Sequence, residues 1–168
     1  MKEQDLVIMP DGGGYVVRVR GRANFEYAVP LRDLAGREEG FDSFRIDLGE
    51  CIAMDSTFMG VLTMIALRGR KSGVQIELFN ASEVLKKLLR DLGVAKLFIF
   101  SDGSVGEPAA AAAAGADGDL LKAAETVAEA HETLAAADSA NAERFAAVID
   151  YARQDVENLK AQKAGEKK

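Results

Sequence analysis

The sequence contains no tryptophan, and aromatic residues occupy only 7 % of its 168 positions. Hydrophobic residues make up 48 %, so the chain can form a core, which must be built mainly from aliphatic side chains. A single cysteine, Cys51, excludes an internal disulfide and any metal site that needs several thiolates. The single histidine, His131, provides no histidine cluster for a metal ion or a catalytic site.

Long apolar segments are also missing. The first residues, MKEQDLVIMPDGGG, lack the apolar region of a signal peptide. No apolar run approaches the roughly 20 residues that a membrane-spanning helix needs. The alanine run at 109–114 is far shorter and lies between Pro108 and Gly115. We therefore expect a cytoplasmic protein without membrane insertion.

An excess of positive charge is absent as well. The net charge is −6, whereas binding to nucleic acid phosphates requires a basic surface, so nucleic acid is not the expected partner. The acidity is uneven. Residues 1–104 carry 14 Lys and Arg against 15 Asp and Glu, while residues 105–168 carry 7 against 12. The two parts of the chain therefore differ in character.

Residues 1–104 alternate between segments typical of strands and of helices. A turn signal at Pro10–Gly14 separates the first two strands and predicts a hairpin. A short interruption is expected at Gly49-Glu50, and Pro30 predicts a late start or a break in the first helix. The predicted strands are Leu6–Met9, Tyr15–Arg20, Phe44–Leu48 with a continuation at Cys51–Met54, Val74–Phe79 and Lys96–Phe100. The predicted helices run from Asn24 to about Glu39, over Phe58–Leu67 after the capping residues Asp55-Ser56-Thr57, and from Ser82 to Leu92 with Val84, Leu85, Leu88 and Leu89 facing inward. This order predicts an α/β fold with parallel β-α-β units.

The remaining residues form an appendage. Residues 105–118 are rich in alanine and glycine, which favours a flexible linker. An apolar stripe with helical spacing then predicts two amphipathic helices, 119–137 and 142–161, within an extension at 119–162 that ends in a disordered tail at 163–168. One kinked helix is the alternative. The stripe favours docking on the first domain, self-association as a homodimer, or binding to a partner.

No set of residues with catalytic chemistry is evident. His131 lies on the apolar stripe of the appendage, where packing is the ordinary role of a histidine, and Cys51 lies in a predicted strand as a small apolar residue. Asp47, Glu50 and Asp55 are close in sequence, but no histidine or further acidic cluster completes a metal site. We predict no catalytic residues, no metal, no cofactor and no enzymatic activity.

The segment Met54-Asp55-Ser56-Thr57-Phe58-Met59-Gly60 follows a strand and opens an apolar helix. With Ile46-Asp47-Leu48 before it and the helix from Ser82 to Gly93 after it, residues of about 5–103 resemble STAS domains, the bacterial anti-sigma-factor antagonists. Such domains carry a hydrophobic residue followed by Asp-Ser-Ser/Thr-Gly-Leu-Gly. The resemblance implies a small mixed sheet with helices packed against it over residues 1–104.

The resemblance also implies a function in signal transduction and transcription regulation. In that family the serine after the aspartate is phosphorylated by a partner that is both a Ser/Thr switch kinase and an anti-sigma factor. Ser56 occupies that position, which makes it the expected phosphoacceptor, with Thr57 as the alternative. Asp55, Phe58 and Met59 are the expected partner interface. Phe58 replaces the family's glycine, so it is expected either to contact the partner or to obstruct the kinase.

Two other interpretations remain open. Asp55-Ser56-Thr57 is a good helix cap in its own right, which would explain the segment without any switch. The chain could also be a non-catalytic STAS subunit or scaffold, as in the accessory subunit of a lipid-transport ABC complex or a stressosome-like particle. In that case the segment would serve only as a docking surface.

Overall fold

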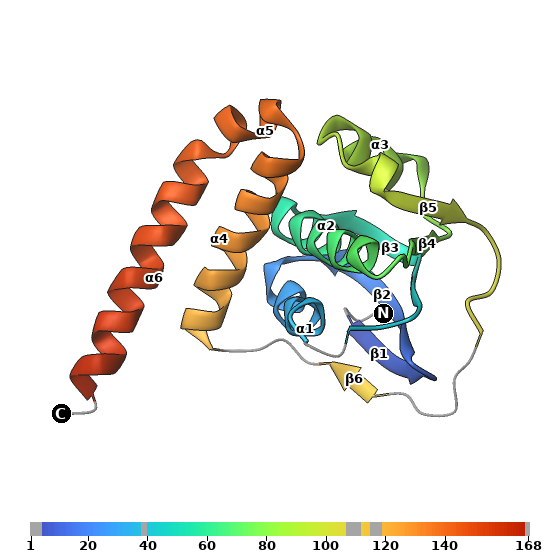
Figure 1. The fold of residues 1–168 in the computed structure, drawn as a ribbon, viewed down its shortest axis with the longest axis horizontal. Helices are drawn as coiled ribbons and strands as arrows, with labels where there is room; N and C mark the ends of the chain where they lie inside the picture. The colour runs from blue at the N-terminus through green and yellow to red at the C-terminus, as the bar shows by residue number, and fades with distance from the viewer. Residues whose placement is uncertain (1–4, 38–39, 107–111, 115–118, 167–168) are drawn as a thin grey trace.

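A single mixed β-sheet organises the first part of the chain. The computed structural model describes residues 5–37, 40–106, 112–114 and 119–166. Within them, six strands lie in the order β5-β4-β3-β2-β1-β6 (Figure 1). Neighbours from β2 to β5 are parallel, while β1 pairs antiparallel with both β2 and β6, so the predicted α/β fold and the hairpin are confirmed. The strands are β1 (Asp5–Asp11), β2 (Gly14–Ala23), β3 (Phe44–Met54), β4 (Ile76–Phe79), β5 (Phe98–Ser101) and β6 (Ala112–Ala114).

Strand β3 is continuous where an interruption was expected at Gly49-Glu50. Its pairing with β2 shifts register between Arg18 and Arg20 and again between Gly21 and Arg22. Such shifts accommodate extra residues without ending the strand. The prediction of a break was therefore wrong, and β3 extends as far as Met54, next to the predicted switch segment.

Helix α1 (Phe25–Ala35) begins at its predicted cap, where the Asn24 side chain accepts a hydrogen bond from the Glu26 amide at 3.0 Å. Pro30 lies inside the helix, so the predicted late start or break is wrong. Pro30 removes one backbone hydrogen bond, but the helix is held by buried apolar side chains on both sides of it. It ends at Ala35, four residues before Glu39, with Gly36 as its C-cap.

Helices α2 (Ser56–Lys71) and α3 (Glu83–Asp91) follow β3 and β4 as predicted. Ser82 caps α3 by accepting a hydrogen bond from the Leu85 amide. Leu85 is buried, but Val84 is 65 % exposed, so its predicted inward orientation is wrong. A 3₁₀ turn at Ala95–Leu97 precedes β5 and takes the place of the first residues of the predicted strand.

The predicted linker at 105–118 is partly structured. Val105 is buried in a small cluster with Met9 and Val16, and residues Ala112–Ala114 form β6 at the edge of the sheet beside β1. These residues correct the expectation of a wholly flexible linker, because β6 hydrogen-bonds to the open edge of β1. Residues 107–111 and 115–118 lie outside the described part of the chain.

The appendage folds into α4 (Leu120–Ala137), a short α5 (Ser139–Arg144) and α6 (Ala146–Glu166). Helix α4 packs against α1 and α2, and α6 packs against the outer side of α4 (Figure 1). Docking on the first domain, one of the three predicted alternatives, is therefore observed within the chain. Helix α6 continues through residues 163–166, which were predicted to be disordered, and Lys163 pairs with Asp119 at 3.5 Å.

One apolar core joins the sheet, α2 and the appendage. Leu134 of α4 and Phe145, between α5 and α6, belong to the same buried cluster as Phe44 of β3 and Phe58 of α2. Within the residues described, no helix combines the length and the apolar character needed to cross a membrane.

Phe58 supplies the first prediction because its side chain is fully buried. Phe58→Ala should lower the free energy of unfolding by about 3–5 kcal/mol, since it leaves a cavity at the start of α2. Urea denaturation monitored by circular dichroism would measure the change. Tyr151→Ala is the control, because that aromatic side chain is 76 % exposed and should change stability by less than about 0.5 kcal/mol. Equal losses in both variants would contradict the assignment of Phe58 to the core.

Candidate functional site

Asp55 connects β3 to α2 and caps the helix. Its side chain accepts a hydrogen bond from the Phe58 amide at 2.8 Å, and its own amide donates to the Ala23 carbonyl at 3.0 Å. The first contact satisfies an amide that the helix leaves unpaired, and the second fastens the start of α2 to the end of β2. Because Asp55 performs the capping, the hydroxyl of Ser56 is available for another contact.

Ser56 uses its hydroxyl to contact the appendage. Its Oγ lies 2.8 Å from Nε2 of His131, a residue 75 positions later on α4. The other ring nitrogen, Nδ1, lies 2.7 Å from the Val127 carbonyl. Since a carbonyl can only accept, Nδ1 carries a proton, and in the neutral ring Nε2 is the acceptor of the Ser56 hydroxyl. Both nitrogens of His131 therefore have a partner.

A close approach of α2 and α4 places these two side chains together. A Cβ built on Gly60 would lie 2.5 Å from the Ala130 carbonyl oxygen and 2.6 Å from the Ala130 Cβ, closer than real Cβ atoms come. Only glycine at this position permits the contact. One residue after Ala130, the ring of His131 is 3 % exposed and packs edge-on against Phe145, with ring centroids 4.9 Å apart.

The carboxyl group of Asp55 is electrostatically unusual. Burial penalises its charged form and raises its pKa above the ordinary value for aspartate. Hydrogen bonds from the amides of Phe58 and Phe25 and the nearby imidazole of His131 oppose this shift without cancelling it. Burial therefore makes the charged form of Asp55 less favourable than that of a solvent-exposed aspartate.

The other predicted site residues are less accessible. Thr57, Phe58 and Met59 are buried, whereas Asp55 and Ser56 are partly exposed. In this conformation Phe58 and Met59 contribute to the chain's own core, so they are not available as surface contacts for a partner. The side chain of Phe58 is fully buried.

His131 is the site residue whose role the sequence did not reveal. Its predicted packing role is correct but incomplete, because the ring also binds Ser56. One sequence signal pointed to this role: His131 is the one ionisable residue on the stripe of apolar side chains. A histidine buried there needs hydrogen-bond partners for both ring nitrogens. Cys51 is buried, and burial raises the pKa of its thiol, which disfavours the reactive thiolate.

The three acidic residues noted in the sequence do not come together as a set. Asp47 lies 3.6 Å from Arg18 and Glu50 lies 3.3 Å from Arg20, while Asp55 caps α2. In the described ranges, no group of three or more His, Cys, Asp and Glu side chains is arranged to hold a metal ion.

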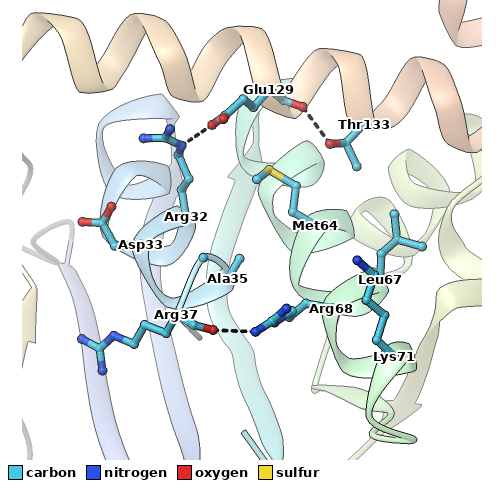
Figure 2. A pocket seen from close by; sticks show the side chains of 11 residues that line it. Arg32, Asp33, Ala35, Arg37, Met64, Leu67, Arg68, Lys71, Glu129 and Thr133 are labelled. Carbon is cyan, nitrogen blue, oxygen red and sulfur yellow. Dashed lines mark hydrogen bonds and ion pairs between the residues drawn. The ribbon is translucent and has the colours of Figure 1, made fainter. Parts of the chain in front are cut away.

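Polar contacts beside the site fasten α4 to the first domain. A groove of about 560 Å³ lies between α1, α2 and α4. Figure 2 shows the side chains that line it, with Arg32 of α1 directed at Glu129 of α4. Arg32 also lies 3.5 Å from Glu125, one turn earlier on α4. At the other end of α4, the buried Asn141 donates to the carbonyls of Leu92 and Leu134 at 2.8 and 2.9 Å. These contacts determine where α4 lies on the domain.

The cap at Asp55 can be tested by comparing two substitutions. Asp55→Asn keeps an oxygen that can accept from the Phe58 amide, whereas Asp55→Ala removes it. The alanine variant should have a free energy of unfolding about 1 kcal/mol lower than that of the asparagine variant at pH 7, measured by urea denaturation. Equal stabilities would show that the cap contributes nothing.

The raised pKa of Asp55 predicts a pH dependence of stability. Above the ordinary aspartate pKa of about 3.9, the unfolded chain loses this proton while the folded chain still holds it. The stability of the wild type relative to Asp55→Asn should therefore be highest below that pH, fall as pH rises through the folded-state pKa, and stay constant above it. Denaturation curves between pH 3.5 and 7 would measure this difference. A rise with pH would contradict the direction of the shift.

Comparison with known proteins places the fold in a family. Residues 10–100, more than half of the chain, match the family model described as Mlab, STAS domain. No curated protein matches the chain significantly.

Several solved structures are similar to this chain. A protein assigned as an anti-sigma factor antagonist from Thermotoga maritima has 15 % identity and a TM-score of 0.48, covering 57 % of this chain and 85 % of its own. The unphosphorylated anti-sigma factor antagonist SpoIIAA has 13 % identity and a TM-score of 0.47, covering 61 % and 90 %. A sulfate transporter family protein from Wolinella succinogenes has 22 % identity and a TM-score of 0.46, covering 54 % and 78 %. The family match decides the assignment: this chain belongs to the STAS-domain family described as Mlab.

Proposed function

We propose that the chain is a regulatory protein-interaction module, similar to an anti-sigma-factor antagonist, that binds a switch kinase or anti-sigma factor through the start of α2. Phosphorylation of Ser56 controls this binding. The observation that carries the proposal is that Asp55 alone caps α2, which leaves the partly exposed Ser56 hydroxyl free of any role in starting the helix. Capping by itself therefore accounts for Asp55 but not for Ser56.

The physical effect of a phosphate at Ser56 supports control at this position. A phosphoserine carries about −1.5 to −2 charges at pH 7, and the amides at the start of α2 can bind it without a change of fold. The same charge would lie next to Asp55, whose carboxylate is already disfavoured by burial. A partner surface built for a neutral hydroxyl would then meet repulsion and lose affinity.

The burial of Thr57 and the partial exposure of Asp55 and Ser56 specify the proposed interface further. Thr57 is a weaker phosphoacceptor candidate than Ser56, because it is buried and a kinase would have to open the first turn of α2 to reach it. The module acts in the cytoplasm by binding proteins and has no catalytic activity, cofactor or nucleic acid partner. Asp55 and Ser56, both partly exposed, form the outer part of the interface.

A second candidate is a non-catalytic STAS subunit of a larger assembly, such as the accessory subunit of a lipid-transport ABC complex. Two observations favour it. The matching family model carries the name Mlab, and the Ser56 hydroxyl is already engaged by His131 within the chain. In this case the start of α2 would dock on another subunit without phosphorylation. A gene for a switch kinase beside the gene of this protein favours the first candidate, and one for an ABC permease favours the second.

Mass spectrometry of the intact protein from its native host tests the switch directly. A phosphorylated form that disappears in Ser56→Ala is expected, and Ser56→Asp should lose a partner that the wild type and Ser56→Ala retain in affinity purification. Ser72→Ala, at the opposite end of α2, is the matched control and should behave as the wild type. If no phosphorylated form exists and both Ser56 variants bind the same partners as the wild type, the second candidate replaces the first.

A further inference from the structure

Helix α4 covers the side of α2 that carries Ser56. At Gly60, one turn after Ser56, the two helices are in direct contact, with Ala130 in the space that a Cβ would occupy. Ala130 and Leu134 of α4 are fully buried in the same core as α2. A partner that approached this side of α2 would therefore meet α4 first.

The contact between Ser56 and His131 leaves room for a proton but not for a phosphoryl group. The Ser56 Oγ and the His131 Nε2 are 2.8 Å apart, which is the length of one hydrogen bond. The ring is confined on its other sides by the Val127 carbonyl at Nδ1 and by the ring of Phe145. It cannot turn aside to admit a phosphate without losing both contacts.

Transfer of a phosphoryl group also requires that the hydroxyl be reached. The Ser56 Oγ must attack the terminal phosphorus of a nucleoside triphosphate held by the kinase, in line with the departing diphosphate, while the hydroxyl proton passes to a base on the kinase. A new oxygen–phosphorus bond forms as the bond to the diphosphate breaks. In the docked arrangement the hydroxyl is directed at His131 instead, so the reaction requires that α4 first move away.

The contacts that hold α4 are suited to release. Three of its buried residues, Ala124, Ala128 and Ala130, are alanines, each of which buries little apolar surface compared with leucine. Leu134 adds one larger apolar side chain in the core, and polar contacts at Arg32 and Asn141 complete the attachment. Helix α6 packs mainly on α4 and would move with it.

We propose that α4 to α6 form a displaceable cover over the Ser56 surface, and that docking of α4 and phosphorylation of Ser56 exclude each other. The unphosphorylated chain is closed, and phosphoserine at position 56 holds it open. A partner of the unphosphorylated chain must displace α4 to reach the surface around Gly60, where Ala130 lies in the closed form. Phosphoserine at position 56 keeps α4 away but repels that partner as well. This inference rests on the proposed role of Ser56 and specifies how that site is regulated.

Hydrogen–deuterium exchange of the full chain tests the proposal without any partner. Phosphoserine can be placed at position 56 during translation, and its exchange compared with that of the unmodified chain. Amide exchange in α4 and α6 should accelerate by at least about tenfold, while β3 and α3 keep their protection. Unchanged or stronger protection of α4 in the phosphoserine chain would overturn the proposal.

A substitution tests the same contact without phosphate. Gly60→Ala should release α4 and α6 to a similar extent, because the new Cβ would collide with Ala130. Gly165→Ala is the matched control: it adds the same methyl group to a helix at a position where the new Cβ meets nothing within 4 Å, and it should exchange as the wild type. Protection of the β3 and α3 amides from exchange shows that the variant is folded. If Gly60→Ala loses that protection, the exchange of α4 in the phosphoserine chain is the test of the proposal.

Failure of this inference is distinguishable from failure of the proposed function. If α4 stays protected in the phosphoserine chain or in a folded Gly60→Ala chain, the cover does not exist, even where Ser56 controls partner binding. If α4 is released while Ser56 variants bind the same partners, the cover exists and the switch role of Ser56 is wrong. Hydrogen–deuterium exchange tests the cover, whereas affinity purification of the Ser56 variants tests the switch.

Discussion

The contact of α2 with α4 at Gly60 is the constraint on which the arrangement around Ser56 depends. Helices that meet through side chains ordinarily lie 8–10 Å apart, and a glycine facing an alanine lets them come closer. Here that approach brings the next residue of α4, His131, within hydrogen-bonding distance of the serine in the first turn of α2. The same approach places Leu134 in the core of the first domain. Position 60 therefore determines both the packing of the appendage and the environment of the site.

Much of the fold could be predicted because it is decided locally. Each helix of the first domain begins at a polar side chain that accepts a hydrogen bond from an amide two or three residues later, as at Asn24, Asp55 and Ser82. Such contacts are visible in the sequence itself. Alternating apolar residues in β2 likewise identify a strand with one face in the core. The position of Asp55-Ser56-Thr57 between a strand and a buried helix followed from these local signals.

The features that the sequence did not predict depend on contacts between distant segments. Pro30 is tolerated because α1 is held against α2, and β3 continues past Gly49 because its neighbour β2 adjusts its register. Val84 matches the apolar face of a helix but lies outside the core, since Leu85, Leu88 and Leu89 pack beneath α3. The pairing of Ser56 with His131 joins residues 75 positions apart. Local sequence patterns do not indicate which residues so far apart in the sequence come into contact.

A capped and covered serine reconciles two interpretations that the sequence left open. Asp55 satisfies the backbone of α2 whether or not α4 is docked, since its partners lie in α2 and β2. The cap at the start of α2 can therefore persist when the appendage moves away, and the hydroxyl of Ser56 can exchange one hydrogen-bond partner for another. Apart from Leu134 and Phe145, which belong to the core, the appendage is held by alanines and a few polar contacts, each of which contributes little by itself. The charge of a single phosphate can therefore shift the equilibrium between covered and uncovered Ser56. A regulatory site requires such a shift.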